Sequence, residues 1–129
     1  MASIIQGEAL YADEMATISS VYHNRLNREM LLQADPTIQY ITPGKPRRLF
    51  DKDLKVDNPY NTYKYKGLPP GPINNPGLEA LKAAIMPAET DFLYFVSNGE
   101  GRHTFTRTIS EHNQAKYELK QKRRMKRKM

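Results

Sequence analysis

The sequence predicts one small α+β domain, made of several helices, a β-hairpin or small antiparallel sheet, and a long proline-rich ordered loop region. A chain of 129 residues with 39% hydrophobic content is large enough for one core and too small for two. Eight of its nine prolines lie between residues 31 and 76, and helical periodicity appears on both sides of this segment. A run of β-forming residues precedes a glycine-containing turn near the C-terminus.

Two helices are expected at the N-terminus. The apolar residues 2–9 can form two helical turns that end in Glu8. A longer helix over residues 13–29 would begin with Asp13 as its N-cap, because apolar side chains then recur at a spacing of about 3.6 residues: Met15, Ile18, Tyr22 and Leu26.

The proline-rich segment, residues 31–76, predicts ordered loop with short strands. Each proline removes a hydrogen-bond donor and restricts the residue before it, so only fragments of helix are expected. Asp35 and Pro36 form a dipeptide that is typical of turns. Apolar and aromatic side chains occur throughout the segment, which favours order over a flexible linker, and long ordered loops are common sites of substrate contact.

A third helix should begin with Asn75 as N-cap and Pro76 in its first turn, and Pro87 should stop it. Its apolar residues would share one face: Leu78, Leu81, Ala84 and Ile85.

The hairpin is predicted from residues 92–96 and 103–107, joined by the turn residues 98–101. Ser110 can then cap a final helix that runs into the C-terminal tail.

The net charge of +6 belongs to the tail and not to the body. Residues 116–129 hold eight basic side chains against one glutamate, while residues 1–115 hold 12 basic and 13 acidic side chains. We therefore predict a folded unit over 1–115 and a basic tail, helical or disordered, over 116–129. A body of nearly zero charge argues against a specific nucleic-acid partner.

Several classes of chemistry lack their sequence signatures. The chain has no cysteine, which excludes disulfides, thiolate metal sites and a cysteine nucleophile. It has no glycine-rich nucleotide-binding motif, no H-E-x-x-H and no G-x-S-x-G, and its three histidines lack the spacing of metal ligands. We expect no cofactor and no metal. No signal peptide and no run of 18 apolar residues is visible in this chain.

Carboxylates are the remaining catalytic candidates. Glu8 lies in the apolar run of residues 3–10, where burial would favour the protonated form that a general acid requires. The alternative is an exposed glutamate at a helix end. Among the histidines, His103 stands out because it follows the glycine turn on a predicted strand, although structural use is the more frequent role of a single histidine.

Short motifs follow one another in a recognisable order along residues 2–115. They are ASIIQGEA at 2–9, VYHNRL at 21–26, LQADPT at 32–37, YNTY at 60–63, GLPPGPI at 67–73, NPG at 75–77, LYFV at 93–96, GRHTF at 101–105 and HN at 112–113. In this order the chain resembles the catalytic domain of the YceG-like endolytic murein transglycosylase family, also called MltG.

The resemblance implies a non-hydrolytic cut of the β-1,4 bond between N-acetylmuramic acid (MurNAc) and N-acetylglucosamine (GlcNAc), which leaves a 1,6-anhydro-MurNAc end. It makes Glu8 the catalytic acid and base. One carboxyl group suffices, because the muramyl C6 hydroxyl takes the place of the water or enzyme nucleophile that other glycosidases activate. Gly7 stands where family members often have a larger residue, and we expect it to loosen the backbone beside Glu8.

The resemblance also indicates a sugar-binding cleft around Glu8. Amide, carboxylate and tyrosine side chains suit sugar hydroxyl and N-acetyl groups. The expected substrate-binding residues are Gln33, Asp35, Tyr60, Asn61, Thr62, Tyr63 and His103. His103 would either assist the reaction or orient a neighbouring side chain.

Peptidoglycan glycan strands are the expected partner, and cell-wall synthases are candidate partners. The family acts at the extracytoplasmic, periplasmic face of the bacterial inner membrane, so we expect a membrane anchor in the parent protein that this chain lacks.

Two alternative functions stay open at this point. The chain could be a non-catalytic cell-wall glycan-binding fragment, which would bind strands without releasing anhydro sugars. Homologues are also sometimes labelled aminodeoxychorismate lyase, a pyridoxal-phosphate enzyme, but 129 residues without a recognisable cofactor lysine argue against that activity.

Overall fold

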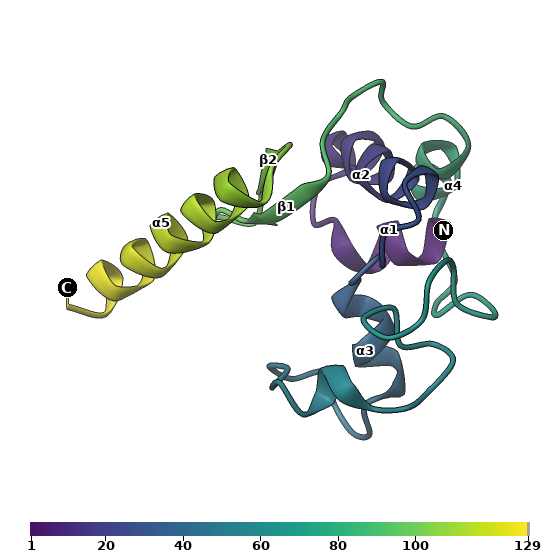
Figure 1. The fold of residues 1–129 in the computed structure, drawn as a ribbon, viewed down its shortest axis with the longest axis horizontal. Coiled ribbons are helices and arrows are strands. Elements are labelled where there is room, and N and C mark those ends of the chain that lie inside the picture. The colour runs from purple at the N-terminus through teal and green to yellow at the C-terminus, as the bar shows by residue number, and fades with distance from the viewer. Residues whose placement is uncertain (129) are drawn as a thin grey trace.

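The computed structural model describes residues 1–128 and forms a small α+β domain, as the sequence predicts. Two short 3₁₀ turns, η1 (Ala12–Glu14) and η2 (Asp53–Lys55), accompany the regular elements (Figure 1). The described helices and strands are α1 (Ala2–Glu8), α2 (Met15–Asn27), α3 (Asp35–Ile41), α4 (Leu78–Ile85), β1 (Tyr94–Ser97), β2 (His103–Thr106) and α5 (Ile109–Lys128).

The core lies where α1, α2 and α4 pack against one another. Its largest fully buried apolar side chains are Ile4, Ile5, Ile18, Tyr22 and Leu32. The loop before α4 is tied to α1 by polar contacts, in which the Asn74 side chain donates to the Ser3 carbonyl at 2.8 Å and the Gly77 N–H donates to Gln6 at 2.9 Å. These contacts fix α1, and with it Glu8 at the end of the helix.

The N-terminal helices form where the sequence predicts them, but the predicted cap of the second helix is wrong. Helix α2 begins at Met15, after η1, and Glu14 occupies the N-cap position without capping through its side chain. The Asp13 carboxylate instead pairs with Arg102 at 2.9 Å. Both acidic residues therefore face the hairpin, 89 residues away in sequence, and not the end of their own helix.

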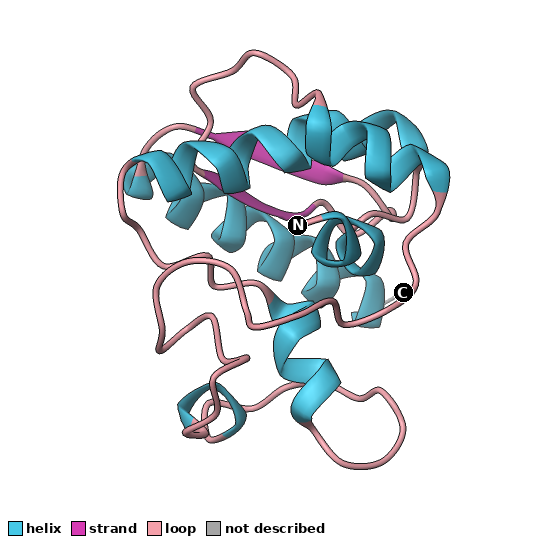
Figure 2. Ribbon diagram, turned by 90° about the vertical axis from the view of Figure 1, so that its right-hand side faces the viewer, coloured by secondary structure: helices cyan, strands magenta, loops and turns pink. Residues whose placement is uncertain are grey.

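The proline-rich segment contains no strand within its described residues 31–76, so the prediction of short strands there is wrong. Asp35 and Pro36, predicted as a turn, open helix α3 instead. A proline is tolerated in the first helical turn because its missing N–H would have no intrahelical partner there. Helix α3 and the turn η2 lie below the other helices in Figure 2, and we call this part of the molecule the lobe of α3 and η2.

Helix α4 begins later than predicted and buries a different face. Gly77 is its N-cap, in place of Asn75. Ala80 and Ala83 are buried, whereas Leu78 and Ile85 are 66% and 79% exposed. The small alanines let α4 approach the core closely, and this contact outweighs the burial of the larger side chains that the apolar spacing predicts.

The predicted hairpin is confirmed, with β1 antiparallel to β2 and Ser97 paired with His103. The final helix is also present, but Thr108 and not Ser110 caps it. The Glu111 N–H donates to Thr108 Oγ1, and the Thr108 N–H donates back to Glu111 Oε1, both at 3.1 Å. This reciprocal pattern is a capping box.

Helix α5 packs on the hairpin and continues across the predicted boundary between residues 115 and 116 as one helix to Lys128. Met129, the last residue of the predicted tail, lies outside the described residues. The division into 1–115 and 116–129 stays a prediction. Within residues 1–128, no helix has both the length and the apolar composition needed to cross a membrane.

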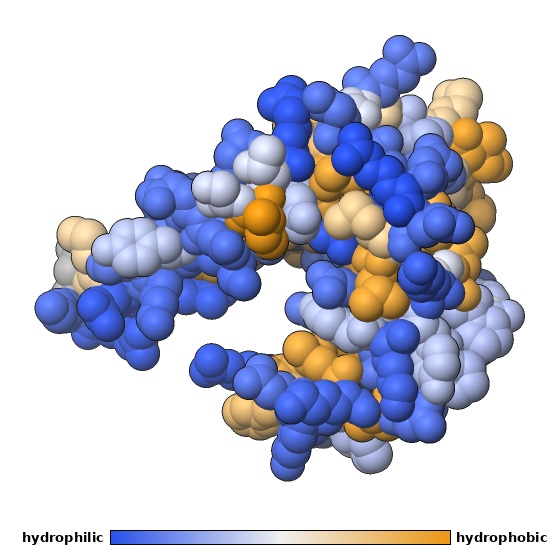
Figure 3. Space-filling model, in the orientation of Figure 1, coloured by the Kyte–Doolittle hydropathy of each residue, from blue (hydrophilic) through white to orange (hydrophobic). Residues whose placement is uncertain are grey.

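Two projecting parts of the molecule lie on either side of an open space. Helix α5 extends to one side and the lobe of α3 and η2 extends to the other (Figure 1), and the space-filling surface is hollowed between them (Figure 3). The C-terminal end of α1 lies at the base of this hollow, where the body of the domain joins its two arms.

Candidate active site

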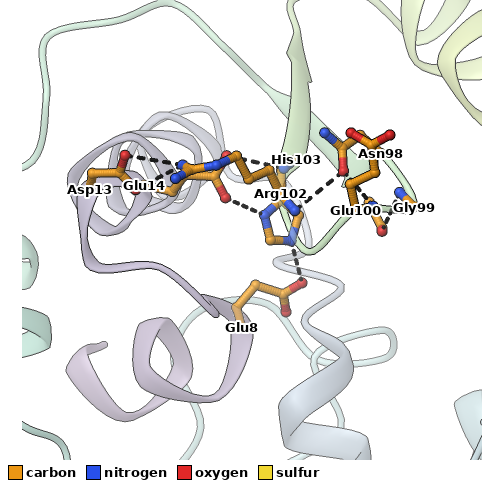
Figure 4. Close-up of polar contacts among 9 residues, drawn as sticks. Glu8, Asp13, Glu14, Asn98, Gly99, Glu100, Arg102 and His103 are labelled. Carbon is orange, nitrogen blue, oxygen red and sulfur yellow. Dashed lines mark hydrogen bonds and ion pairs between the residues drawn. The ribbon is translucent and has the colours of Figure 1, made fainter.

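Glu8 and His103 meet at the base of the hollow. Helix α1 ends at Glu8, whose side chain is 18% exposed, and His103 begins β2 on the neighbouring hairpin. The His103 Nε2 atom lies 3.7 Å from Glu8 Oε1. Figure 4 shows the imidazole ring between the Glu8 carboxylate and a second carboxylate, that of Glu14.

Glu14 holds His103 in place through two contacts. The His103 backbone N–H donates to Glu14 Oε2 at 3.0 Å, and Glu14 Oε1 lies 2.9 Å from the ring Nδ1. Because a carboxylate only accepts, Nδ1 carries a hydrogen and donates it, which leaves Nε2 to face Glu8. The His103 ring also packs on Phe95 in a T-shaped arrangement, with the ring centroids 5.2 Å apart.

The two carboxylates determine the charge of His103. The contact with Glu8, which is the larger cause, and the contact with Glu14 raise the pKa of His103 above its ordinary value. Burial opposes this shift without cancelling it. His103 therefore keeps its second proton to a higher pH than a free imidazole does. Glu8 thus has a proton carrier within 4 Å of its carboxylate.

A cavity of about 400 Å³ opens beside this pair. Gln33 reaches it from a left-handed backbone conformation with a φ of 50°. The Tyr63 hydroxyl donates a hydrogen bond to the Asp35 carboxylate at its edge. Five of the sequence-predicted site residues thus come together here: Glu8, Gln33, Asp35, Tyr63 and His103.

The remaining three predicted residues do not line this cavity. Asn61 is fully buried: its Nδ2 donates to the Leu54 and Val56 carbonyls at 3.0 and 2.8 Å, and its Oδ1 accepts from the Tyr63 N–H at 2.9 Å. Thr62 Oγ1 accepts from the Ala34 N–H at 2.9 Å.

Tyr60, the third of these residues, packs its ring on Tyr40, with the ring centroids 5.1 Å apart.

Asn61 and Thr62 lie behind the side chains that line the cavity and hold them in place. Asn61 holds Tyr63, and the Thr62 carbonyl accepts from the Gln33 N–H at 3.1 Å. They fold the loop that presents the cavity residues.

A second cavity, of about 480 Å³, shares Glu8 and Asp35 with the first. Its other walls are more apolar and come from the start of α3 and the loops beside it: Gly7, Pro36, Gln39, Tyr40, Pro46, Ile73 and Asn74. The candidate acid therefore stands at the junction of two cavities, with room on both sides.

Gly7 lies against Pro36 where α1 meets α3. A Cβ atom at this position would lie 2.8 Å from Pro36 Cβ, which is closer than such atoms approach. Glu8 follows Gly7 directly and Asp35 precedes Pro36 directly, so this contact sets the spacing of the two carboxylates. Gly7 permits this tight approach, and the loosening of the backbone beside Glu8 stays a prediction.

Two residues of the site were not singled out from the sequence. Glu14 follows the predicted cap Asp13 in the sequence, and its contact with His103 joins positions too distant to be seen as a local pattern. Tyr22 was assigned to the core, where it lies, but it also forms part of the cavity lining.

The buried Tyr22 hydroxyl has no hydrogen-bond partner among residues 1–128. Burial, and then the charges of Glu8 and Asp35, raise the pKa of Tyr22 well above its ordinary value, so the hydroxyl keeps its proton. No group of three or more His, Cys, Asp or Glu side chains in the described part of the chain is arranged to hold a metal ion.

The sequence matches the YceG-like family over residues 1–118. It is 47% identical over 116 residues to a Bacillus subtilis protein named endolytic murein transglycosylase, and 34% identical over 119 residues to proteins of the same name from Streptococcus pneumoniae. A crystal structure of a YceG-like protein from Listeria monocytogenes superposes with a TM-score of 0.82 at 46% identity, over 88% of this chain.

The chain spans only part of these proteins. The match covers 90% of this chain but 32% of the Bacillus protein, 88% of this chain but 22% of the Streptococcus proteins, and 36% of the Listeria chain.

Proposed function

The chain belongs to the YceG-like family, and we propose that it carries the catalytic centre of an endolytic lytic transglycosylase that cuts peptidoglycan between MurNAc and GlcNAc. One observation carries the proposal: Glu8 stands at the junction of two cavities, with the His103 imidazole 3.7 Å from its carboxylate. The names of the relatives supply the substrate class, and the geometry around Glu8 suits the reaction.

Glu8 acts twice in the proposed reaction. As a carboxylic acid it donates its proton to the glycosidic oxygen, and the bond from the muramyl C1 to that oxygen breaks. As a carboxylate it then takes the proton from the muramyl C6 hydroxyl, whose oxygen forms a new bond to C1. The proton that Glu8 gave is thereby replaced, no water is consumed, and the product is a 1,6-anhydro-MurNAc end.

His103 supports Glu8 in the first step, in which Glu8 acts as the acid. When Glu8 has given up its proton, a protonated imidazole 3.7 Å away stabilises the carboxylate. Glu14 keeps the imidazole at that place and orientation. Glu14 acts only through His103 and is a positioning residue.

The two cavities support a cut inside the strand. A glycan bound across Glu8 can continue into the polar cavity on one side and into the more apolar cavity, with Tyr40, on the other. Gln33, Asp35 and Tyr63 present polar groups toward sugar hydroxyl and N-acetyl groups. Tyr60, Asn61 and Thr62 contribute by folding the loop that holds them.

The substrate also indicates where the protein acts. Peptidoglycan lies outside the cytoplasm, so we propose action at the extracytoplasmic face of the inner membrane. Cell-wall synthases are the proposed protein partners, and an anchor in the parent protein is the proposed means of attachment to the membrane.

The test is a digestion of purified glycan strands with this chain, followed by mass spectrometry of the products. We expect 1,6-anhydro-MurNAc ends and fragments of intermediate length, which an internal cut produces. Hydrolysed reducing ends in their place would contradict the transglycosylase reaction. Binding of strands without any cleavage would favour the non-catalytic glycan-binding alternative.

A further inference from the structure

The cavity beside Glu8 has walls of opposite charge. Glu8 and Asp35 lie on the wall formed by α1 and α3, and three cations lie on the wall formed by α2 and α5. We call the second wall the cationic wall and define it by Arg25, Lys116 and Arg123. The reaction proposed for Glu8 makes no use of these cations.

Arg25 is a buried cation that lacks an acidic partner. It is 7% exposed, and its Nε and Nη1 donate to the Leu93 and Leu31 carbonyls at 2.7 Å each. Its guanidinium lies 5.0 Å from the Tyr94 ring centroid. No carboxylate among residues 1–128 forms an ion pair with it. A buried charge without a counter-charge is costly, and an anionic ligand in the cavity would relieve that cost.

Lys116 and Arg123 extend the charge along the cavity. They are seven residues apart on α5, so they share one face and lie about 10 Å apart along the helix axis. Within residues 1–128 neither side chain forms an ion pair, whereas Lys122 on the neighbouring face pairs with Glu100 at 2.7 Å. Leu119, between them, packs on the hairpin near Gly99 and keeps this face toward the cavity.

A histidine of α5 also lines this side of the cavity. His112 lines the cavity and stacks on Tyr94, with ring centroids 5.1 Å apart. Burial first, and then the charges of Lys116 and Arg25, lower the pKa of His112 below its ordinary value. The imidazole therefore loses its second proton at a lower pH than a free imidazole does, and the three permanent cations supply the positive charge of this side.

We propose that the cationic wall binds a carboxylate carried by the lactyl side chain of a muramyl residue, so that the site selects strands containing MurNAc over neutral glycans. This inference rests on the proposed function. The sugar rings of a glycan strand are uncharged, and the lactyl group is the place where carboxylates join it. The carboxylate is either that of the lactyl group in a strand without peptides or one in an attached peptide stem, and both present the same chemistry to Arg25, Lys116 and Arg123.

The test measures binding in the Glu8→Gln background, where no substrate is consumed. Three ligands of equal strand length are compared: peptide-bearing strands, strands stripped of peptides, and neutral N-acetylglucosamine oligomers. We expect at least one carboxylate ligand to bind about 10-fold more tightly than the neutral oligomer at low salt, with the difference shrinking as salt increases. A preference for the stripped strands identifies the lactyl carboxylate, and a preference for the peptide-bearing strands identifies the stem.

The decisive variant is Lys116→Ala with Arg123→Ala. Both side chains are exposed at the cavity rim, so the expected loss is about two- to fivefold in affinity per charge, and only for the carboxylate ligands. The matched control is Lys120→Ala with Arg124→Ala, which removes two charges from exposed positions on the same helix that do not line the cavity. We expect the control to keep the preference.

The outcomes separate this inference from the proposed function. Equal binding of neutral and carboxylate ligands, or an equal loss in the control variant, would overturn the cationic wall as a specific site and leave the transglycosylase reaction intact. Failure of all three ligands to bind would overturn both proposals. Cleavage of strands by the wild-type chain, measured in parallel, tests the reaction independently of any charge preference.

Discussion

Two clusters of polar side chains in this molecule differ in burial and in surroundings: Asn61 and Thr62 are fully buried, whereas the Glu8 side chain is 18% exposed. Around Asn61 and Thr62, each buried side-chain polar group has a hydrogen-bond partner, and neither residue lines either of the two cavities beside Glu8. Around Glu8, the nearest partner is His103 at 3.7 Å, and two cavities open beside it. Fully bonded polar groups hold a loop in shape, whereas a partly bonded carboxyl next to open space is free to react.

The largest expected effect is on catalysis, at Glu8. Glu8→Gln keeps the size of the side chain and removes its proton transfer, so we expect cleavage to fall by about 10³-fold. The free energy of unfolding should change by less than about 1 kcal/mol. Release of anhydro ends and thermal melting measure the two quantities. Glu79→Gln, at an exposed glutamate of α4, is the control and should alter neither; full activity of Glu8→Gln would refute the mechanism.

The next largest effect is on stability, at Asn61. Asn61→Ala removes three hydrogen bonds and leaves buried backbone groups without partners, so we expect a loss of about 2–4 kcal/mol in the free energy of unfolding. Chemical denaturation measures this loss. Asn58→Ala, which removes a single turn contact to the Tyr60 N–H, should cost less. If Asn61→Ala instead abolished cleavage in a protein of normal stability, the contrast between the two clusters would fail.

Glu14→Gln should lower the pKa of His103 toward its ordinary value, because one of the two carboxylates beside the ring is removed. The pKa of His103 is raised in the folded protein, so its protonation stabilises the fold fully below about pH 6.5, and this contribution is lost as the pH rises through the raised value. The variant keeps Glu8, the larger cause of the shift, and loses Glu14. The gain in thermal stability from pH 9 to pH 6 should therefore be smaller than in the wild type.

The same variant should also alter the reaction. We expect an activity about 10-fold lower, because the imidazole is less well held, and a limb of the pH–rate profile that moves to lower pH. Asp13→Asn is the matched control, since Asp13 pairs with the exposed Arg102 and does not touch His103. An identical pH profile in Glu14→Gln and the wild type would show that Glu14 has a structural role only.

The smallest expected effect is at the cavity edge. Tyr63→Phe removes the hydrogen bond to Asp35 and a polar group from the cavity, so we expect a two- to fivefold rise in KM, with about 1 kcal/mol or less lost in stability. Tyr65→Phe removes an equivalent bond to Asp57 on the exposed side of the loop and should leave KM unchanged. Equal effects of the two variants would assign Tyr63 to the loop and not to the site.

Elements with local signals could be predicted from the sequence. The apolar run before Glu8 gave α1, and the β-forming run with its glycine turn gave the hairpin. The caps could not be predicted as well. Asp13 and Glu14 both suit a helix start, but the hairpin offers Arg102 and His103 as stronger partners, and a contact across 89 residues leaves no local pattern.

The candidate site also has features that the sequence predicts and features that it does not. Motif order predicts which segments surround Glu8, but it does not say which side chains of a segment face the cavity. Within YNTY, Tyr63 reaches the cavity, whereas Asn61 and Thr62 turn inward to satisfy backbone groups. That choice depends on where the Leu54 and Ala34 backbone groups come to lie, which only the folded chain determines.

The contact between Gly7 and Pro36 makes position 7 a spacer of zero thickness between α1 and α3, because a Cβ atom there would lie 2.8 Å from Pro36 Cβ. Any side chain at this position would therefore have to push the two helices apart, and with them Glu8 and Asp35, which follow and precede the contact directly.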